Sequence, residues 1–480
     1  MTTVDWLGVI HPWVGVNVDL EALQKIVSQV MHVPSTKCGP PVVIGDMNYG
    51  RVYSFQLPLR TVVARLVAPV KPLFKTENEV AAMDFVRSTR HYVSLSQRLF
   101  LMNDIGRTSL PIPTVFAYCS EANNPVGAEW LIMEHMPGVE MGDAWDELQL
   151  PQKRRLALDL VDLYDQLSRL KASGCGGIYH SIKSVDDSNL LTKRSADFSE
   201  IVRLRSPRWV PLSQGSLHML RSHCDHSTNN CFELGPIHNI SLLNYLVNIP
   251  SPSRTLPVFT SDEYVKLIAF NGNPTTRSDH DLPSREKCVE LFQAIHNLYS
   301  NSTFFGPAGD ALNFGFSHGD LHEGNILIDP KSGAITGVID WEAAGFRPLW
   351  TNIRGVGWFE EDRQRFIFGS DEPGNFDEEG DPEDLELRAF FRTELHRRNP
   401  DLFTSFLGAI ELRAVVQAAA DDPRPVGETD IFLTRYHKLG YWKEQRRGPF
   451  PWNMNAWLNR RMDLDEKEMA RRRNLCGLDL

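Results

Sequence analysis

Residues 316–345 read FSHGDLHEGNILIDPKSGAITGVIDWEAAG, and this stretch decides how the rest of the chain is interpreted. Two short apolar runs, ILI and ITGVI, flank the turn sequence KSG. Apolar runs of this length on either side of turn residues predict a β-hairpin. Asp320 and Asn325 lie before the first run, and Asp340 ends the second. The hairpin would therefore gather two carboxylates and one amide at one end.

These three side chains form a set that phosphoryl transfer from a metal-bound nucleotide requires. A substrate hydroxyl loses a proton as it attacks phosphorus, and the Asp320 carboxylate can accept that proton. Mg²⁺ prefers oxygen ligands and commonly takes one or two carboxylates, which suits Asn325 and Asp340. Protein kinases use an Asp base, an Asn five residues later and a further Asp for metal. The spacing from Asp320 to Asn325 matches that arrangement.

The block departs from protein kinases in its flanking residues. His318-Gly319-Asp320 stands where they carry His-Arg-Asp, and Asp340-Trp341-Glu342 stands where they carry Asp-Phe-Gly. The block closely resembles the aminoglycoside phosphotransferase family, also called the phosphotransferase enzyme family, whose members carry HGDxHxxN followed by I-D-[FW]-E/D. Choline and homoserine kinases belong to the wider kinship. The resemblance implies an α+β, bilobal kinase-like fold that uses ATP, or GTP, with Mg²⁺.

A glycine-containing segment, VVIGDMNYGRVYSFQL at residues 42–57, predicts two strands joined by a loop. Such a loop, with Gly45, Asn48 and Gly50, could fold over nucleotide phosphates and let backbone N–H groups approach them. An ordinary hairpin turn explains the same residues equally well.

A third strand, at residues 61–66, carries Arg65, and a helix is predicted to begin near Glu77 and Glu79. A kinase small lobe needs a strand cation on the phosphates and a helix glutamate that holds it, and we assign these roles to Arg65 and Glu79. The family usually has lysine at the first position, and arginine occurs in fungal-type relatives with a V-A-R-L segment. Glu77 is the rival glutamate, and Lys71 and Lys75 are rival cations. A surface ion pair or an edge-strand arginine is the other interpretation.

Residues 128–138, AEWLIMEHMPG, predict an apolar strand that stops at a turn, as a hinge between two lobes should. In the resembling family, the backbone of this hinge hydrogen-bonds adenine, which makes the Glu134 carbonyl and the Met136 N–H the candidates. A plain buried strand is the alternative.

Other segments complete the prediction. Asp19 is a candidate helix cap, and apolar spacing predicts helices at the following places: 19–31, 151–171, about 284–300, 386–395 and 402–420. The acidic segment from Ser370 to Glu386 reads as a solvated loop. We expect an N-terminal extension at 1–39, a nucleotide-binding lobe at 40–137 and a helical lobe at 138–480 that holds the hairpin and insertions. No ligand is assigned to residues 172–283.

The composition limits the class of protein. A chain of 480 residues with 42% hydrophobic and 23% charged residues is typical of globular proteins with more than one core unit. A net charge of -11 argues against a broad nucleic-acid surface. Seven scattered cysteines without metal spacing, no signal-peptide pattern and no run long enough to span a membrane lead us to expect a cytoplasmic protein.

The sequence therefore predicts a small-molecule kinase that transfers the γ-phosphate to a hydroxyl group. A pseudokinase or nucleotide-binding scaffold is the alternative, which the presence of Asp320, Asn325 and Asp340 disfavours and Arg65 mildly favours. A protein kinase is disfavoured by Gly319 and by the absence of an Ala-Pro-Glu segment after Gly345. Natural-product chemistry other than phosphorylation stays open.

Overall fold

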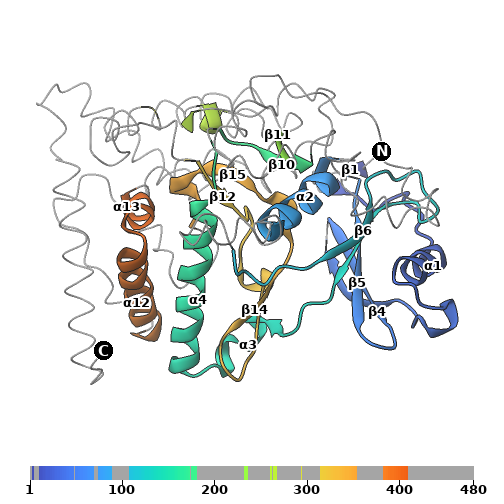
Figure 1. Ribbon diagram of the computed structural model, residues 1–480, viewed down its shortest axis with the longest axis horizontal. Helices are drawn as coiled ribbons and strands as arrows, with labels where there is room; N and C mark the ends of the chain where they lie inside the picture. Colours follow the sequence, from blue (N-terminus) through green and yellow to red (C-terminus); the bar gives the residue numbers. More distant parts are fainter. Residues whose placement is uncertain are drawn as a thin grey trace, which may run out of the picture.

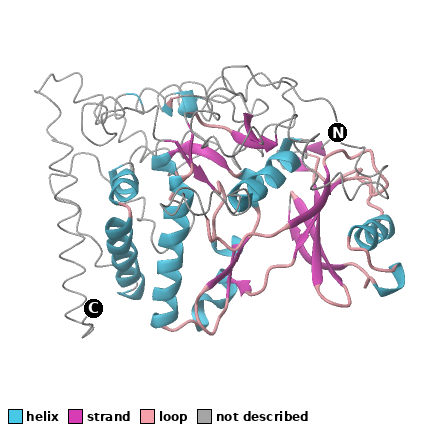
Figure 2. Ribbon diagram, in the orientation of Figure 1, coloured by secondary structure: helices cyan, strands magenta, loops and turns pink. Residues whose placement is uncertain are grey.

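The computed structural model describes residues 3–4, 10–47, 49–69, 74–88, 108–172, 174–180, 232–235, 260–261, 263–266, 293, 314–353 and 382–408. Strands and helices are both present in these residues (Figure 2), so the prediction of an α+β chain is confirmed. Asn48, Lys71 and most of the helix predicted at about 284–300 lie outside the described residues.

A five-stranded antiparallel sheet contains the glycine-containing segment, with the strand order β3-β4-β5-β7-β6. Its strands are β3 (Val42–Met47), β4 (Gly50–Gln56), β5 (Thr61–Val67), β6 (Val115–Cys119) and β7 (Glu129–Glu134). A short pair, β1 (Thr3–Val4) and β2 (Ile10–His11), precedes it. The sheet lies at the right of Figure 1, and the predicted strands of this region are confirmed.

Helix α1 (Leu20–Val30) packs on this sheet, as predicted. The Asp19 carboxylate accepts a hydrogen bond from the Ala22 amide at 2.9 Å, which satisfies one of the unpaired donors of the first turn. The buried face joins a cluster with Phe55 and Trp130 of the sheet, and it consists of Leu23, Ile26 and Val27. The helical spacing read from the sequence thus selects the face that is buried.

Helix α2 (Phe74–Ser88) begins three residues before the predicted start at Glu77. It packs against β6, against β10 (Gly177–His180) and against the turn at residues 341–343 that follows Asp340. Helix α2 therefore lies between the five-stranded sheet and the segment with the candidate catalytic residues (Figure 1).

Two three-stranded sheets hold the stretch that decided the sequence analysis. The first has the order β14-β13-β8, with β8 (Val139–Glu140), β13 (Ile326–Ile328) and β14 (Ile335–Val338). The second has the order β15-β12-β9, with β9 (Lys171–Ala172), β12 (Phe314–Ser317) and β15 (Gly345–Pro348). The hairpin predicted between the two apolar runs is confirmed as β13 and β14. Strand β10 pairs with β11 (Phe232–Gly235).

The remaining described helices lie beyond these sheets. Helix α3 (Met141–Ala144) follows β8, and α4 (Leu150–Arg169), α12 (Pro382–Arg398) and α13 (Pro400–Gly408) pack together at the left of Figure 1. Helix α12 begins at Pro382, so the end of the predicted acidic loop is helical, and that part of the prediction is wrong. Glu383 and Glu386 there pair with Lys153 and Arg154 of α4, which explains why acidic residues fold into this helix.

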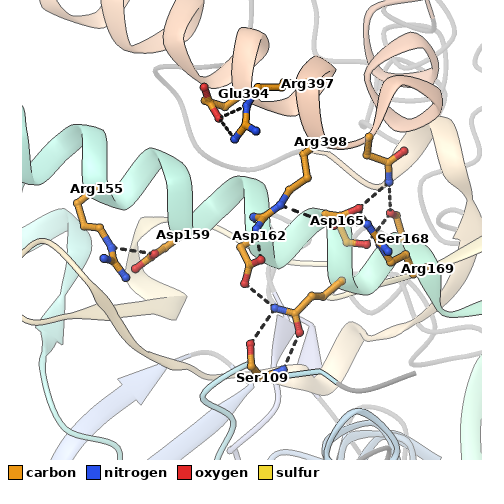
Figure 3. Close-up of polar contacts among 12 residues, drawn as sticks. Ser109, Arg155, Asp159, Asp162, Asp165, Ser168, Arg169, Glu394, Arg397 and Arg398 are labelled. Atoms are coloured by element: carbon orange, nitrogen blue, oxygen red, sulfur yellow. Dashed lines mark hydrogen bonds and ion pairs between the residues drawn. The ribbon is translucent and has the colours of Figure 1, made fainter. Parts of the chain in front are cut away.

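Polar contacts also fix the other end of α12 on α4 (Figure 3). Arg398 pairs with Asp162 at 2.8 Å, and the Asn399 amide donates to Asp165 at 2.8 Å. The Ser109 amide donates to the side chain of Gln166, so the same helix is also tied to the chain before β6. Helix α4 thus connects α12 with the segment before β6.

One hydrophobic cluster runs from the sheet to the helices. It includes Val63 of β5, Phe85 of α2, Phe316 of β12, Leu160 of α4 and Phe391 of α12. The candidate site therefore lies on a continuous core. Cys38, Cys119 and Cys175 are free thiols. Within the described residues, no helix is both long and apolar enough to cross a membrane.

Candidate active site

The candidate catalytic segment leaves and re-enters one sheet at adjacent points. Ser317 of β12 pairs with Gly345 of β15, so residues 318–344 form an excursion whose ends are fixed side by side. Within the excursion, the Ile339 amide donates to the Asn325 carbonyl at 3.0 Å. This bond places Asn325 beside the residue that precedes Asp340, although the two are far apart in the sequence.

Asp320 and Asn325 are held together directly. The Asn325 amide nitrogen donates to the Asp320 backbone carbonyl at 2.8 Å, and the Asn325 side chain is buried. The Asp320 side chain is 30% exposed, and one of its carboxylate oxygens lies 3.8 Å from Nε2 of His322. Asp320 can therefore meet a solute from solvent, while Asn325 is fixed behind it.

Asp340 has an unusual backbone. Its φ of 64° and ψ of 62° lie in the left-handed region, which costs free energy for a residue other than glycine and is enriched at functional sites. The Asp340 carboxylate contacts Nη1 of Arg65 at 2.5 Å and is 13% exposed. Burial opposes ionisation, but the charges of Arg65 and Lys75 hold the pKa of Asp340 below its ordinary value.

Arg65 is the centre of a buried charge cluster, which we define as Arg65, Lys75, Glu79, Asp340 and Glu342. Its side chain is 3% exposed, and Nη1 also contacts Glu79 at 2.6 Å while Nη2 contacts Glu342. Burial acts against the charged guanidinium, yet the three carboxylates keep the pKa of Arg65 well above its ordinary value. Arg65, the cation predicted on the third strand, thus contacts three acidic side chains.

Gly50 makes room for this guanidinium. A Cβ atom built at Gly50 would lie 2.9 Å from Nε of Arg65, closer than real Cβ contacts. Gly50, for which a phosphate-covering loop and an ordinary hairpin turn were both open interpretations, therefore also admits Arg65. Gly45 lies in β3, opposite Val52 at a register irregularity of the β3–β4 ladder, and Asn48 lies outside the described residues.

The structure distinguishes the two candidate glutamates of α2. Glu79 lies against Arg65, whereas Glu77 accepts hydrogen bonds from Ser120 at 2.6 Å and from Tyr118 at 3.2 Å. Burial, with the charges of Asp340 and Glu342, raises the pKa of Glu79 to about 7, although Arg65 opposes this shift. Within the described residues, Oε2 of Glu79 has no hydrogen-bond partner, which is consistent with a raised pKa.

Four contacts of this site were not predicted from the sequence. Glu342 binds both Arg65 and Lys75, with Nζ of Lys75 at 2.7 Å from Oε2 of Glu342. The Asn78 amide donates to the carbonyls of Glu342 and Ala344. Lys75, Asn78 and Glu79 share one face of α2 because their spacing follows the helical repeat. Two features of the sequence could have indicated these contacts. One is the helical spacing of Lys75, Asn78 and Glu79, and the other is the position of Glu342 directly after Asp340-Trp341.

His318 holds the excursion through contacts with Ile339 and Trp341. Its Nε2 lies 2.9 Å from the Ile339 carbonyl, and its ring packs on Trp341 with centroids 4.6 Å apart. Burial lowers the pKa of His318 to about 4. The neutral ring therefore carries its proton on Nε2, because a carbonyl oxygen accepts hydrogen bonds and cannot donate one. His318 thus fixes the backbone next to Asp340.

The candidate hinge connects the two parts of the site. Glu134 ends β7; its amide donates to the Thr114 carbonyl, and its carboxylate accepts from the Thr114 hydroxyl at 2.7 Å. Met136 packs against Gly337 of β14, and the Thr336 hydroxyl donates to the Pro137 carbonyl at 2.6 Å. The chain therefore passes from the five-stranded sheet directly onto the β13–β14 hairpin, where β8 pairs with β13.

The donors available to a cation fit Mg²⁺. The side-chain nitrogen of Asn325 is engaged with the Asp320 carbonyl, which leaves the side-chain oxygen as the atom that could bind a cation, and the Asp340 carboxylate has a second oxygen besides the one on Arg65. One amide oxygen and one carboxylate form a hard donor set that needs phosphate oxygens or water to be complete. Within the described residues, no group of three His, Cys, Asp or Glu side chains is gathered for a metal.

Comparison with known families bears on this segment. Residues 272–369 match the model of the phosphotransferase enzyme family. The resemblance predicted from the HGDLHEGN segment is therefore confirmed. The family match includes Asp320, Asn325, Asp340 and Glu342, and it does not extend to Arg65.

Individual relatives are distant. Two subtelomeric hrmA-associated cluster proteins from two strains of Aspergillus fumigatus are each 22% identical, over 70% of this chain and 64% of their own length. The chain thus spans less than two thirds of the curated relatives it matches. A thermostable mutant of the aminoglycoside phosphotransferase APH(4)-Ia, in a complex with ADP and hygromycin B, has a TM-score of 0.39 at 14% identity, and the match covers 93% of this chain and 98% of that chain. APH(2")-IIa with streptomycin and ATP has a TM-score of 0.39 at 11% identity, covering 89% and 97%.

Proposed function

We propose that this protein is a small-molecule kinase that transfers the γ-phosphate of ATP, or GTP, to a hydroxyl group. The observation that carries the proposal is the contact of Arg65 with both Glu79 and Asp340. It joins the cation of a β-strand and the glutamate of a helix to the carboxylate that follows the catalytic hairpin, which are the parts that kinases assemble on a nucleotide. The match to the phosphotransferase enzyme family supports the same class of reaction.

In this proposal, each residue has a distinct task. Asp320, which is part-exposed, orients the acceptor hydroxyl and takes its proton. Arg65 directs positive charge at the phosphates, and Glu79 holds its guanidinium. Asn325 and Asp340 would hold Mg²⁺, which supplies positive charge across the transferred phosphate when bound. The Glu134 carbonyl and the Met136 N–H would receive the base.

The proposal assigns a two-lobed, kinase-like arrangement to the chain. Residues 40–137 would form the nucleotide-binding lobe after an extension at 1–39, and residues 138–480 the larger lobe. The passage of the chain from β7 onto the catalytic hairpin supports this division. Gly319 supports a small-molecule acceptor: its φ is +87°, and a Cβ would lie 2.1 Å from the Ala343 carbonyl oxygen, so the arginine of protein kinases does not fit there.

The test incubates the protein with Mg²⁺, γ-labelled ATP or GTP, and a panel of hydroxylated metabolites. Asp320→Asn should abolish labelling of the acceptor, whereas Asp329→Asn should not, because Asp329 only caps the hairpin turn through Lys331 and Ser332. Nucleotide binding without transfer to any acceptor would favour the scaffold alternative. Label on protein would favour a protein kinase, and failure to bind Mg·ATP would overturn the proposal.

A further inference from the structure

Lys75 is buried in the charge cluster, yet the tasks assigned above do not use it. It lies in the first turn of α2, is 0% exposed, and places Nζ at 2.7 Å from Oε2 of Glu342. A lysine is rarely buried to this extent unless its charge is paired. The position therefore requires an explanation beyond general packing.

The second contact of Lys75 is with the turn between β3 and β4. Its Nζ donates to the Tyr49 carbonyl at 3.3 Å and lies 5.2 Å from the centre of the Tyr49 ring, within range of a cation–π contact. The Tyr49 carbonyl also accepts from the Ala68 amide at 3.0 Å, just after β5. Tyr49 precedes Gly50, over which the Arg65 guanidinium lies. One ammonium group thus contacts the glycine turn and the segment after Asp340.

Glu342 connects Lys75 to Arg65. Oε2 of Glu342 is the atom that both cations contact, so the carboxylate is shared between Nη2 of Arg65 and Nζ of Lys75. Nη1 of Arg65 meanwhile contacts Asp340. A displacement of Lys75 would therefore move Glu342, and with it the guanidinium that meets Asp340.

We infer, on the basis of the proposed function, that Lys75 is a positioning residue for the nucleotide phosphates. Through Glu342 it fixes the guanidinium of Arg65, and through Tyr49 it fixes the glycine turn, so that the two are held at a set spacing before the nucleotide arrives. Glu342 is a second positioning residue, because it connects Lys75 to Arg65. Neither residue touches the reacting atoms; both act through Arg65 and the turn.

The experiment compares Lys75→Met with Lys153→Met. Lys153 is a matched control because it is also buried, pairs with Glu383 and lies 4.6 Å from the centre of the Trp145 ring, but it joins α4 to α12. Titration with a fluorescent ATP analogue and Mg²⁺ measures the dissociation constant without an acceptor. Lys75→Met removes two charge-assisted hydrogen bonds, one to Glu342 and one to the Tyr49 carbonyl. We therefore expect Lys75→Met to weaken nucleotide binding about 10- to 100-fold and Lys153→Met to leave it unchanged.

Two further readouts separate positioning from a loss of stability. The double variant Lys75→Met with Glu342→Gln should bind the nucleotide almost as tightly as whichever single variant has the lower affinity. The reason is that Lys75 and Glu342 act through the same chain of contacts. Hydrogen exchange without nucleotide should become faster at Tyr49 and Gly50 in Lys75→Met and stay unchanged in Lys153→Met.

The outcomes are distinguishable. Equal affinities for Lys75→Met and Lys153→Met, or fully additive effects of Lys75→Met and Glu342→Gln, would overturn the inference and leave the proposed function in place. A wild-type protein that does not bind Mg·ATP would overturn the proposed function and the nucleotide role of Lys75 together. In that case the exchange measurement would still report whether Lys75 holds the turn.

Discussion

Replacing Gly319 by alanine tests how tightly the excursion at residues 318–344 is packed. Gly319 has a φ of +87°, and a Cβ there would lie 2.1 Å from the carbonyl oxygen of Ala343 and 2.8 Å from Nη2 of Arg347. The carbonyl is backbone and accepts a hydrogen bond from Arg347, so it cannot rotate away as a flexible side chain would. The alanine must therefore displace the 341–344 segment or its own backbone.

The size of the effect follows from two contributions. A left-handed conformation costs an alanine about 1–2 kcal/mol relative to glycine. Forcing an extra methyl group into a packed site adds about 1–3 kcal/mol. Gly15 isolates the first contribution, because its φ of +79° is similar and nothing lies within 4 Å of a Cβ built there. We expect Gly319→Ala to lower the free energy of unfolding by about 2–5 kcal/mol, and Gly15→Ala by about 1–2 kcal/mol.

Urea unfolding followed by tryptophan fluorescence measures both variants, with the wild-type protein as reference. Since the displaced segment carries Asp340 and Glu342, Gly319→Ala should also weaken binding of Mg·ATP, while Gly15→Ala should not. Equal losses of stability in the two variants would show that the Ala343 carbonyl yields freely. The 341–344 segment would then not be rigidly placed.

Four further outcomes follow from the site. Asp320→Ala should lower turnover by roughly 10² to 10⁴, measured as acceptor phosphorylation, and an unchanged rate would exclude it as the base. Gly50→Ala should destabilise the fold by about 1–3 kcal/mol in urea unfolding, because the guanidinium that it meets is held by three carboxylates. Chelation of Mg²⁺ should abolish ATP binding in equilibrium dialysis, and restoration by excess Mg²⁺ checks the cause. Burial lowers the pKa of His318 to about 4 from 6.5, so the unfolded chain binds a proton that the folded chain excludes, and stability falls as the pH drops through this range. The loss is about 2 kcal/mol between about pH 7 and about pH 5, and His318→Gln should lack it in urea unfolding at both pH values.

The elements that could be predicted are those with local signals. The hairpin β13–β14 follows from two apolar runs around a Ser-Gly turn, and α1 follows from Asp19 and an apolar spacing that continues for three turns. In both cases the stabilising contacts lie within a few residues of each other, so the sequence contains both partners. The start of α2 was placed three residues late because Phe74 and Lys75 are fixed by tertiary contacts and not by a cap.

The charge cluster could not be derived in the same way. Arg65 and Glu342 are separated by 277 residues, and nothing in the periodicity of either segment reports that they meet. The motif gave Asp340 because kinases require an acid there, and the I-D-[FW]-E/D segment gave an acid at Glu342, but neither motif indicates which cation Glu342 contacts. Contacts of this kind depend on how β5, α2 and the excursion pack, which local patterns leave open.

The same cluster gives a physical reason for arginine at position 65. A lysine has one nitrogen at its tip, whereas the guanidinium has two terminal nitrogens that are fixed relative to each other. Nη1 contacts Glu79 and Asp340, and Nη2 contacts Glu342, so the third carboxylate contacts a second terminal nitrogen, which lysine lacks. Glu342 stands at the acidic position of the I-D-[FW]-E/D segment, and in this chain that acid pairs with the second terminal nitrogen of Arg65. Arg65→Lys alone should weaken binding of Mg·ATP, because one nitrogen must then serve the carboxylates that two nitrogens contact. Adding Glu342→Gln should weaken binding little further, because the connection from Lys75 through Glu342 to residue 65 is already broken. A double variant that binds much more weakly than Arg65→Lys would show that Glu342 acts independently of residue 65.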